Sequence, residues 1–176
     1  MKVPEDVSNP DEVAGAGVAG GADGAGDLDG HPKGGKPANP ASVVIERRVE
    51  WPDTDAGGLY QYQSVFRWIE AAEAVLHERL GIVSEMFGDS PRAHVEATYR
   101  LPLRFLDTVY VELAVAAVGR TSVRYEFCVR KDGDVHAYGS MTSVHTPGGS
   151  DRPEPWPRHL RKALERGGVQ RAERVG

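Results

Sequence analysis

The sequence predicts an α+β fold in which an antiparallel sheet covers one long helix. Within residues 62–82, apolar side chains recur at helical spacing, and most charged side chains fall elsewhere on the helical wheel. After this segment the apolar period changes to two, which is typical of strands. Because one strand, one helix and then several strands follow each other, we expect antiparallel pairing rather than a parallel βαβ sheet.

Strands are expected both before and after this helix in the sequence. One covers residues 42–51, and an antiparallel meander of about four covers residues 94–101, 108–118, 121–131 and 134–146. The turn sequence "KDGD" joins the last two as a hairpin. A helix of about 30 Å requires the sheet to curl round it. The edges and the outer face of that sheet then need a partner.

The chain has 176 residues, enough for one domain with tails, and we place the domain at residues 41–148. Residues 1–40 are rich in Gly, Ala, Asp and Pro, so a disordered tail is expected there. Residues 149–176 are predicted to form a basic extension with a short helix. Its basic face is expected to be solvated surface, with contacts to phosphates as the second interpretation.

Charge and composition exclude several classes of function. A formal net charge of -5 argues against nucleic acid as a partner. No apolar run approaches the ~18 residues of a membrane span, and the first residues lack the apolar region of a secretory signal. We therefore expect a cytoplasmic protein without a membrane partner. The single cysteine, Cys128, is interpreted as a packed thiol, and neither a metal site nor a cofactor is expected.

One short motif is misleading. The sequence "GAGVAG" at residues 15–20 fits the G-x-G-x-x-G fingerprint for dinucleotide phosphates. That chemistry requires a strand before the glycines and a helix after them, whose N-terminus faces the pyrophosphate. Neither is expected in this segment, so we interpret the match as chance.

The ten residues directly ahead of the helix, "DTDAGGLYQY" at 53–62, combine two carboxylates, two adjacent glycines and two tyrosines. Asp53 is expected to begin a turn and to cap backbone amides. Gly57 and Gly58 leave room for a ligand to approach the backbone closely. Asp55 lies just outside the helix, where the positive end of the helix dipole favours its ionised form.

These residues resemble a known family. A strand ending in an aromatic residue, then "DTDAGG", a tyrosine, a helix with F-x-W-x-E, and later Y-x-x-P before a hairpin resemble the hotdog-fold thioesterases of the 4-hydroxybenzoyl-CoA thioesterase family. The resemblance covers about residues 42–146. It implies a hotdog fold, with a curved antiparallel sheet wrapped round one long central helix. It also implies a homodimer or homotetramer, with the site between subunits, that hydrolyses an acyl-CoA or acyl-carrier-protein thioester.

The resemblance also implies the residues of the site. Asp55 is the expected catalytic carboxylate, Gly58 is the glycine of the motif, and Tyr62 supplies the backbone N–H that polarises the thioester carbonyl. The hydroxyl of Tyr62 has no settled role. The expected substrate-binding residues are Gly57, Tyr60, Phe66, Glu70, Ser122 and Thr142.

The chemistry of hydrolysis suits this arrangement. The reaction passes through a tetrahedral oxyanion, and the unpaired N–H groups of a helix N-terminus are donors fixed before the reaction. Asp55 either attacks the carbonyl and forms an anhydride or activates water as a general base, and the sequence leaves both routes open. Asp107, His94, His136 and His145 are not expected to take part in the chemistry.

Two alternatives stay open at this point. Some hotdog proteins hydrate enoyl thioesters or add an amine such as glycine at the β-carbon before hydrolysis. Tyr62, where the acyl-CoA members have histidine, keeps that reaction open. Arginine usage and the composition of the tail indicate a GC-rich actinobacterial genome, in which such proteins serve natural-product pathways. The second alternative is a non-catalytic acyl-binding module on the same fold.

Overall fold

The computed structural model describes residues 37–175. Residues 1–36, which include the glycine motif and most of the expected tail, lie outside the described residues. In chain order the elements are β1 (Ser42–Arg48), the 3₁₀-helix η1 (Trp51–Asp53), α1 (Tyr62–Leu80), α2 (Val83–Met86), β2 (Arg92–Tyr99), β3 (Thr108–Val118), β4 (Ser122–Lys131), β5 (Asp134–Val144), η2 (Pro147–Gly149), α3 (Arg158–Arg166) and β6 (Glu173–Arg174).

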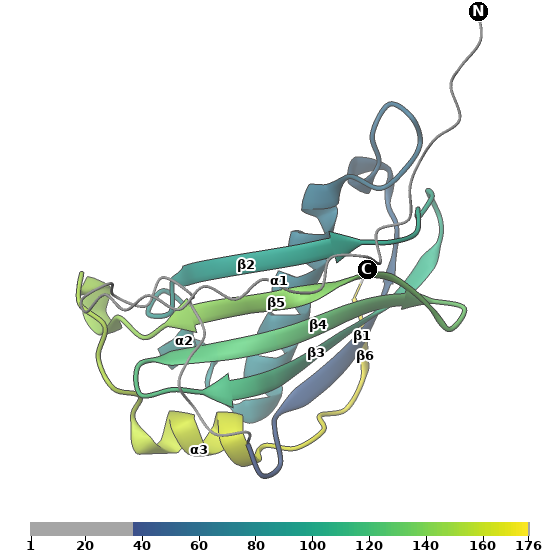
Figure 1. Ribbon diagram of the computed structural model, residues 1–176. Coiled ribbons are helices and arrows are strands. Elements are labelled where there is room, and N and C mark those ends of the chain that lie inside the picture. The colour runs from purple at the N-terminus through teal and green to yellow at the C-terminus, as the bar shows by residue number, and fades with distance from the viewer. Residues whose placement is uncertain (1–36, 176) are drawn as a thin grey trace, which may run out of the picture.

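The predicted α+β hotdog fold is confirmed. The described strands form one six-stranded sheet in the order β2-β5-β4-β3-β1-β6, and α1 lies across one face of it (Figure 1). Every pair is antiparallel except the short pair of β1 with β6. The expected meander is right for β3, β4 and β5 only. β2 pairs with β5 at the far edge, because residues 100–107 form a connection too long for a tight hairpin with β3.

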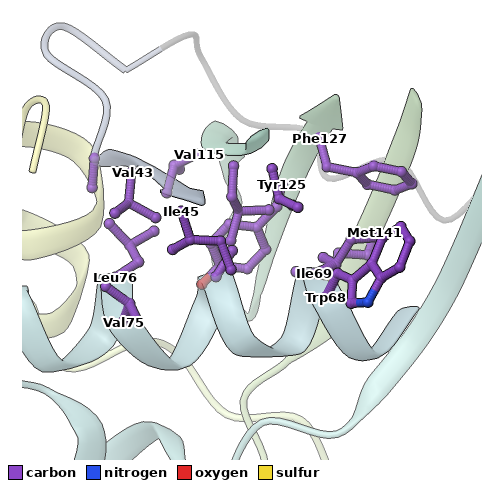
Figure 2. Close-up of a cluster of buried hydrophobic side chains, with 14 of the residues drawn as sticks. Val43, Ile45, Trp68, Ile69, Val75, Leu76, Val115, Tyr125, Phe127 and Met141 are labelled. Carbon is purple, nitrogen blue, oxygen red and sulfur yellow. The ribbon is translucent and has the colours of Figure 1, made fainter. Parts of the chain in front are cut away.

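The core lies between α1 and the sheet. Helical spacing gives α1 one apolar face, which includes Val65, Trp68, Ile69, Ala72 and Leu76, and all five side chains are buried. They pack against buried residues of the strands. Figure 2 labels six of these strand residues: Val43, Ile45, Val115, Tyr125, Phe127 and Met141. The helix ends before the predicted residue 82 because Gly81 takes a left-handed φ of 70° and caps it.

Other element bounds differ from the prediction for local reasons. β1 stops at Arg48, and the predicted last residues of that strand lead into η1, where Pro52 has no N–H to donate to a ladder. β2 begins and ends two residues earlier than expected, and β5 ends at Val144. The sequence did not indicate α2 or β6, because elements this short carry no period.

The C-terminal residues pack against the same core. Leu160 and Leu164 on α3 are buried, as is Trp156 just before it, and α3 contacts β3. β6 then covers the outer edge of β1. The opposite edge, β2, is exposed along most of its length. No helix among residues 37–175 is long and apolar enough to cross a membrane.

Candidate active site

Asp53 anchors the loop that precedes α1. Its side chain is 5% exposed, and one carboxylate oxygen accepts a hydrogen bond from Arg67 Nη2 at 2.6 Å. The other oxygen accepts the amide of Glu50 at 3.0 Å. The carbonyl of Asp53 accepts the amide of Gln61 and the hydroxyl of Ser64, which ties η1 to the first turn of α1. The prediction that Asp53 caps backbone amides is confirmed.

Asp55 has a different environment. It is exposed, and its Oδ1 accepts the amides of Gly57 at 2.8 Å and Leu59 at 3.2 Å. Its own amide donates to the Leu59 carbonyl at 2.8 Å, so the carboxylate stands at the neck of a tight turn. No ion pair to a described residue involves Asp55, and its Oδ2 has no described partner. The carboxylate is therefore held in place while one oxygen remains open to solvent.

The two glycines shape this turn. Gly58 has a φ of +74°, a left-handed backbone conformation that residues other than glycine rarely adopt. Its amide donates to the Asp55 carbonyl at 3.0 Å. A Cβ on Gly57 would lie 3.1 Å from Asp55 Oδ1. Both glycine amides are thus engaged by Asp55, and the free donors of this region lie further along the chain.

Those donors are at the N-terminus of α1. Among residues 37–175, the backbone amides of Tyr62 and Gln63 have no hydrogen-bond partner, as expected for the first positions of a helix. Asp53, Thr54 and Asp55 pair with Leu59, Tyr60 and Gln61 across the turn, so Asp55 stands opposite a residue three positions before Tyr62. That spacing bounds the distance between the Leu59 and Tyr62 Cα atoms at about 11 Å.

The two tyrosines of the loop are placed differently. The Tyr62 side chain is 61% exposed, and its hydroxyl accepts a bond from Gln63 Nε2 at 3.0 Å. Tyr60 points towards the core, where its ring stacks on Trp68 with centroids 6.1 Å apart. Burial, with a smaller effect of Tyr99, raises the pKa of Tyr60 to about 12. The Tyr60 hydroxyl is therefore a neutral donor that bonds the His136 carbonyl.

A cavity of about 250 Å³ opens between α1 and β2. Phe66, Ile69, Val95 and Met141 give it apolar walls, and Glu70 and Arg92 line its polar end. Two of the expected substrate-binding residues, Phe66 and Glu70, therefore line one cavity. Both lie in the N-terminal half of α1, the helix that follows the Asp55 turn.

Neither Ser122 nor Thr142 lines this cavity, although Met141 beside Thr142 does. Ser122 lies nine positions along β4 from Lys131, which pairs with Asp107 in the loop beside the Asp55 turn. At ~3.3 Å per residue this puts Ser122 roughly 30 Å from that end of the strand. Thr142 pairs with Arg124 on β4 and with His94 on β2, and it is buried. Ser122 of the same chain therefore does not reach the Asp55 turn.

Sequence reasoning missed a polar cluster on the buried side of α1. Arg92 donates to both carboxylate oxygens of Glu73, at 2.5 Å and 3.1 Å, and to Ser143 Oγ at 2.6 Å. One turn further, His77 Nε2 lies 3.0 Å from the Tyr125 hydroxyl. Burial lowers the pKa of His77, opposed by the nearby Glu73. The available signal was the i, i+4 spacing of Glu73 and His77 inside an apolar stripe.

The other titratable groups singled out in the sequence have packing contacts. The Nδ1 atoms of His136 and His145 lie 3.1 Å from the carbonyls of Pro102 and Glu154, so both rings are satisfied by backbone. His94 is exposed beside Glu96. Burial raises the pKa of the half-buried Cys128 thiol, as expected for a packed cysteine.

Comparisons with known proteins agree with this architecture. The model of the thioesterase superfamily matches residues 65–137. A 1,4-dihydroxy-2-naphthoyl-CoA hydrolase of Prochlorococcus marinus (strain NATL1A) is 29% identical over 104 residues, which cover 52% of this chain and 69% of the relative.

Two solved structures extend the comparison. A gentisyl-coenzyme A thioesterase superposes with a TM-score of 0.60 at 26% identity, over 69% of this chain and 98% of that one. A thioesterase from Thermus thermophilus, complexed with coenzyme A and Zn, gives a TM-score of 0.64 at 27% identity, over 73% of this chain and 96% of that one.

The fold and these matches identify the class of the protein as a thioester hydrolase with the hotdog fold. The predicted resemblance to the hotdog-fold thioesterases is confirmed.

Proposed function

We propose that this chain hydrolyses an acyl-CoA thioester at the N-terminus of α1, with Asp55 as the reacting carboxylate. The observation that carries this proposal is the juxtaposition of a fixed, exposed carboxylate with the two free amides of Tyr62 and Gln63. Donors that are already oriented stabilise the oxyanion without reorganisation, and one such donor contributes ~2.7–4 kcal/mol to lowering the barrier.

The thioester carbonyl oxygen would point at the free amides of α1. In one route the open Oδ2 of Asp55 attacks the carbonyl carbon, the carbon–sulfur bond breaks, and coenzyme A leaves as the thiol once its sulfur takes a proton. Water then cleaves the anhydride and restores the carboxylate. In the other route Asp55 takes a proton from the attacking water. Both routes release one thiol and one acid, and both need Asp55 ionised.

The acyl group would occupy the cavity between α1 and β2. Its apolar walls at Phe66, Ile69, Val95 and Met141 suit a flat hydrocarbon or aromatic group, and Glu70 and Arg92 stand where polar substituents would point. The named relatives act on hydroxylated aromatic acyl-CoA substrates, a 1,4-dihydroxy-2-naphthoyl and a gentisyl group. We therefore propose a hydroxylated aromatic acyl-CoA as the substrate.

A homodimer formed through β2 would complete the site. That strand is a free sheet edge with Val95 and Tyr99 each 39% exposed, whereas β6 covers the other edge. Pairing two β2 strands would close the open side of the cavity. It is also the arrangement that would allow Ser122 and Thr142 of one subunit to approach the Asp55 turn of the other.

A screen of thioesters by release of free thiol tests the proposal. Coenzyme A esters of hydroxylated aromatic acids should react fastest, ahead of short aliphatic esters, and the same acids on an acyl carrier protein should react more slowly. Binding without thiol release from any ester would contradict hydrolysis and favour an acyl-binding module. Mass spectrometry of an enoyl thioester reaction, with and without glycine, would reveal β-carbon chemistry as a separate product.

A further inference from the structure

We infer that Trp51 and Phe105 form a platform that binds the adenine ring of coenzyme A, with Arg48 and Arg104 holding its phosphates. This inference rests on the proposed function, because it concerns the far end of the same substrate. It goes beyond that function by assigning a nucleotide subsite to residues outside the catalytic turn.

The exposure of Trp51 is unusual within this chain. Its side chain is 74% exposed, whereas Trp68 and Trp156 are 0% and 6% exposed. Phe105 is 45% exposed. The centroids of the Trp51 and Phe105 rings are 5.9 Å apart, with the planes at 90°. Edge-to-face packing leaves ring faces uncovered. An exposed pair of aromatic rings is a surface on which a flat heterocycle can stack.

The platform is built onto the loop of the candidate active site. Trp51 lies four residues before Asp55, so their Cα atoms are separated by at most about 14 Å. Its carbonyl accepts both the amide and the hydroxyl of Thr54, which fixes η1 to the Asp55 turn. This places the platform within reach of a nucleotide that is joined to the reacting thioester through a flexible pantetheine arm that bends back towards the loop.

Phe105 is held to the same loop from the other side. Arg104, its neighbour in the chain, forms a β-bridge with Leu59, whose amide bonds the Asp55 carboxylate. On the other side of Phe105, the amide of Leu106 donates to the Val49 carbonyl at 2.9 Å. Leu106 keeps a left-handed φ of 74°, a conformation that costs free energy for a residue with a side chain.

The cations near the platform are available for a ligand. Arg48 and Arg104 are exposed, and in the part of the chain that the structure describes neither guanidinium has a salt bridge or hydrogen bond. Arg67 and Lys131, in contrast, are already paired with Asp53 and Asp107. Guanidinium groups bind phosphate oxygens in a bidentate manner. The exposed acids of the same segment are Glu50 and Asp55, and Asp55 belongs to the reacting end of the substrate.

The test compares an acyl-CoA with the matching acyl-pantetheine, which lacks the nucleotide. Trp51→Ala should raise KM for the acyl-CoA at least about fivefold, as expected when base stacking is lost, and should leave kcat and the KM for acyl-pantetheine unchanged. Trp51→Phe keeps a flat ring and should recover most of the affinity. Arg104→Ala should raise KM for the acyl-CoA alone, and its matched control is Arg158→Ala on α3. Tyr138→Ala on the outer face of the sheet is the aromatic control.

Calorimetric titration with coenzyme A and with pantetheine measures what the nucleotide contributes to binding, without any catalytic step. The wild-type chain should bind coenzyme A more tightly, and Trp51→Ala should remove that difference. If Trp51→Ala changes KM for both esters equally, or leaves coenzyme A binding intact, the subsite is wrong while hydrolysis stands. If the wild-type chain binds coenzyme A through Trp51 yet releases no thiol, the subsite is right and the proposed hydrolysis is wrong.

Discussion

Asp53 and Asp55 stand two residues apart in one loop, yet their carboxylates lie in opposite surroundings. Asp53 is buried and is bonded by Arg67 and by the amide of Glu50. Asp55 is exposed, and its carboxylate accepts bonds from the amides of its own turn. The D-x-D pattern thus combines an anchor, which fixes the loop to α1, with a carboxylate that stays exposed to solvent.

The two carboxylates differ in their surroundings because Asp53 ends the 3₁₀-helix η1, whereas Asp55 begins the tight turn after it. Asp53 is the last residue of η1, so its side chain faces the first turns of α1, where Arg67 lies. Asp55 opens the tight turn that Gly58 closes with its left-handed φ. A loop needs both functions, because a carboxylate on a loose segment would not hold its place against an oxyanion site.

The largest expected effect is on turnover at Asp55. Asp55→Asn keeps an oxygen that can accept the amides of Gly57 and Leu59, but it removes the negative charge. Turnover should fall about 10²–10⁴-fold, the usual contribution of a proton-transfer or nucleophilic group, while the melting temperature moves by no more than about 2 °C. Thiol release and a thermal melt check both. Unchanged hydrolysis would remove Asp55 from the chemistry.

Asp53→Asn should show the reverse pattern. The substitution leaves Arg67 without its carboxylate partner and weakens a buried hydrogen-bond cluster, at a cost of about 1–3 kcal/mol. For a chain of this size, at about 2–4 °C per kcal/mol, the melting temperature should fall by about 2–12 °C. Turnover at a temperature where the variant is folded should fall less than in Asp55→Asn. If Asp53→Asn had normal stability but no turnover, Asp53 would be the reacting carboxylate and not the anchor of the loop.

His77 extends the comparison to a group buried far from the loop. Burial lowers the pKa of His77 below its ordinary value of 6.5. Protons therefore bind the unfolded chain more readily than the folded one, and stability is lost as pH falls below about 6.5. Removing the titrating ring in His77→Gln should flatten the decrease of melting temperature between about pH 8 and pH 5. An equally steep decrease would assign the acid sensitivity to other groups.

The smallest effect is expected from the N-terminal tail. Deleting residues 1–36 should leave activity and melting temperature unchanged, because a segment rich in Gly, Ala, Asp and Pro has few large apolar side chains to bury. Deleting residues 1–40 also removes the Asn39 carbonyl that accepts the Gly168 amide at 3.1 Å and the Asn39 amide that donates to Glu165. Each such bond contributes about 1 kcal/mol, so the longer deletion should lower the melting temperature by a few degrees. A large effect of the shorter deletion would contradict the prediction of a dispensable tail.

The sequence predicted the helix and the long strands, because the spacing of apolar residues along the chain determines them. The helical period of residues 62–82 and the alternation of the long strands placed α1, β3, β4 and β5 within two residues of their bounds. Turn chemistry predicted Asp53 as a cap of backbone amides, and the structure confirms it, whereas the catalytic role of Asp55 came from the family resemblance and stays a prediction. The position of β2 beside β5 could not be predicted, because a strand's period does not say which neighbour it pairs with.

Contacts between distant segments were equally hidden. Arg67 is fourteen residues from Asp53, and Arg92 is nineteen from Glu73, with no spacing rule that joins either pair. The exposed Trp51 and Phe105 come from loops more than fifty residues apart, which only the folded chain brings into contact. The amide donors of α1 are backbone groups, so no residue type marks them in the sequence.

The most direct test of the proposed site removes one backbone N–H. Tyr62 is the first residue of α1, a position that accepts proline, and Gln61 before it has φ -74° and ψ 142°, which a following proline favours. Tyr62→Pro therefore deletes the donor with the helix intact, and Tyr62→Ala, which keeps the amide, is the matched control. If the Tyr62 amide stabilises the oxyanion, Tyr62→Pro should turn over about 10²–10³-fold more slowly than Tyr62→Ala at equal melting temperature. Equal thiol release by the two variants would contradict the oxyanion site at the N-terminus of α1.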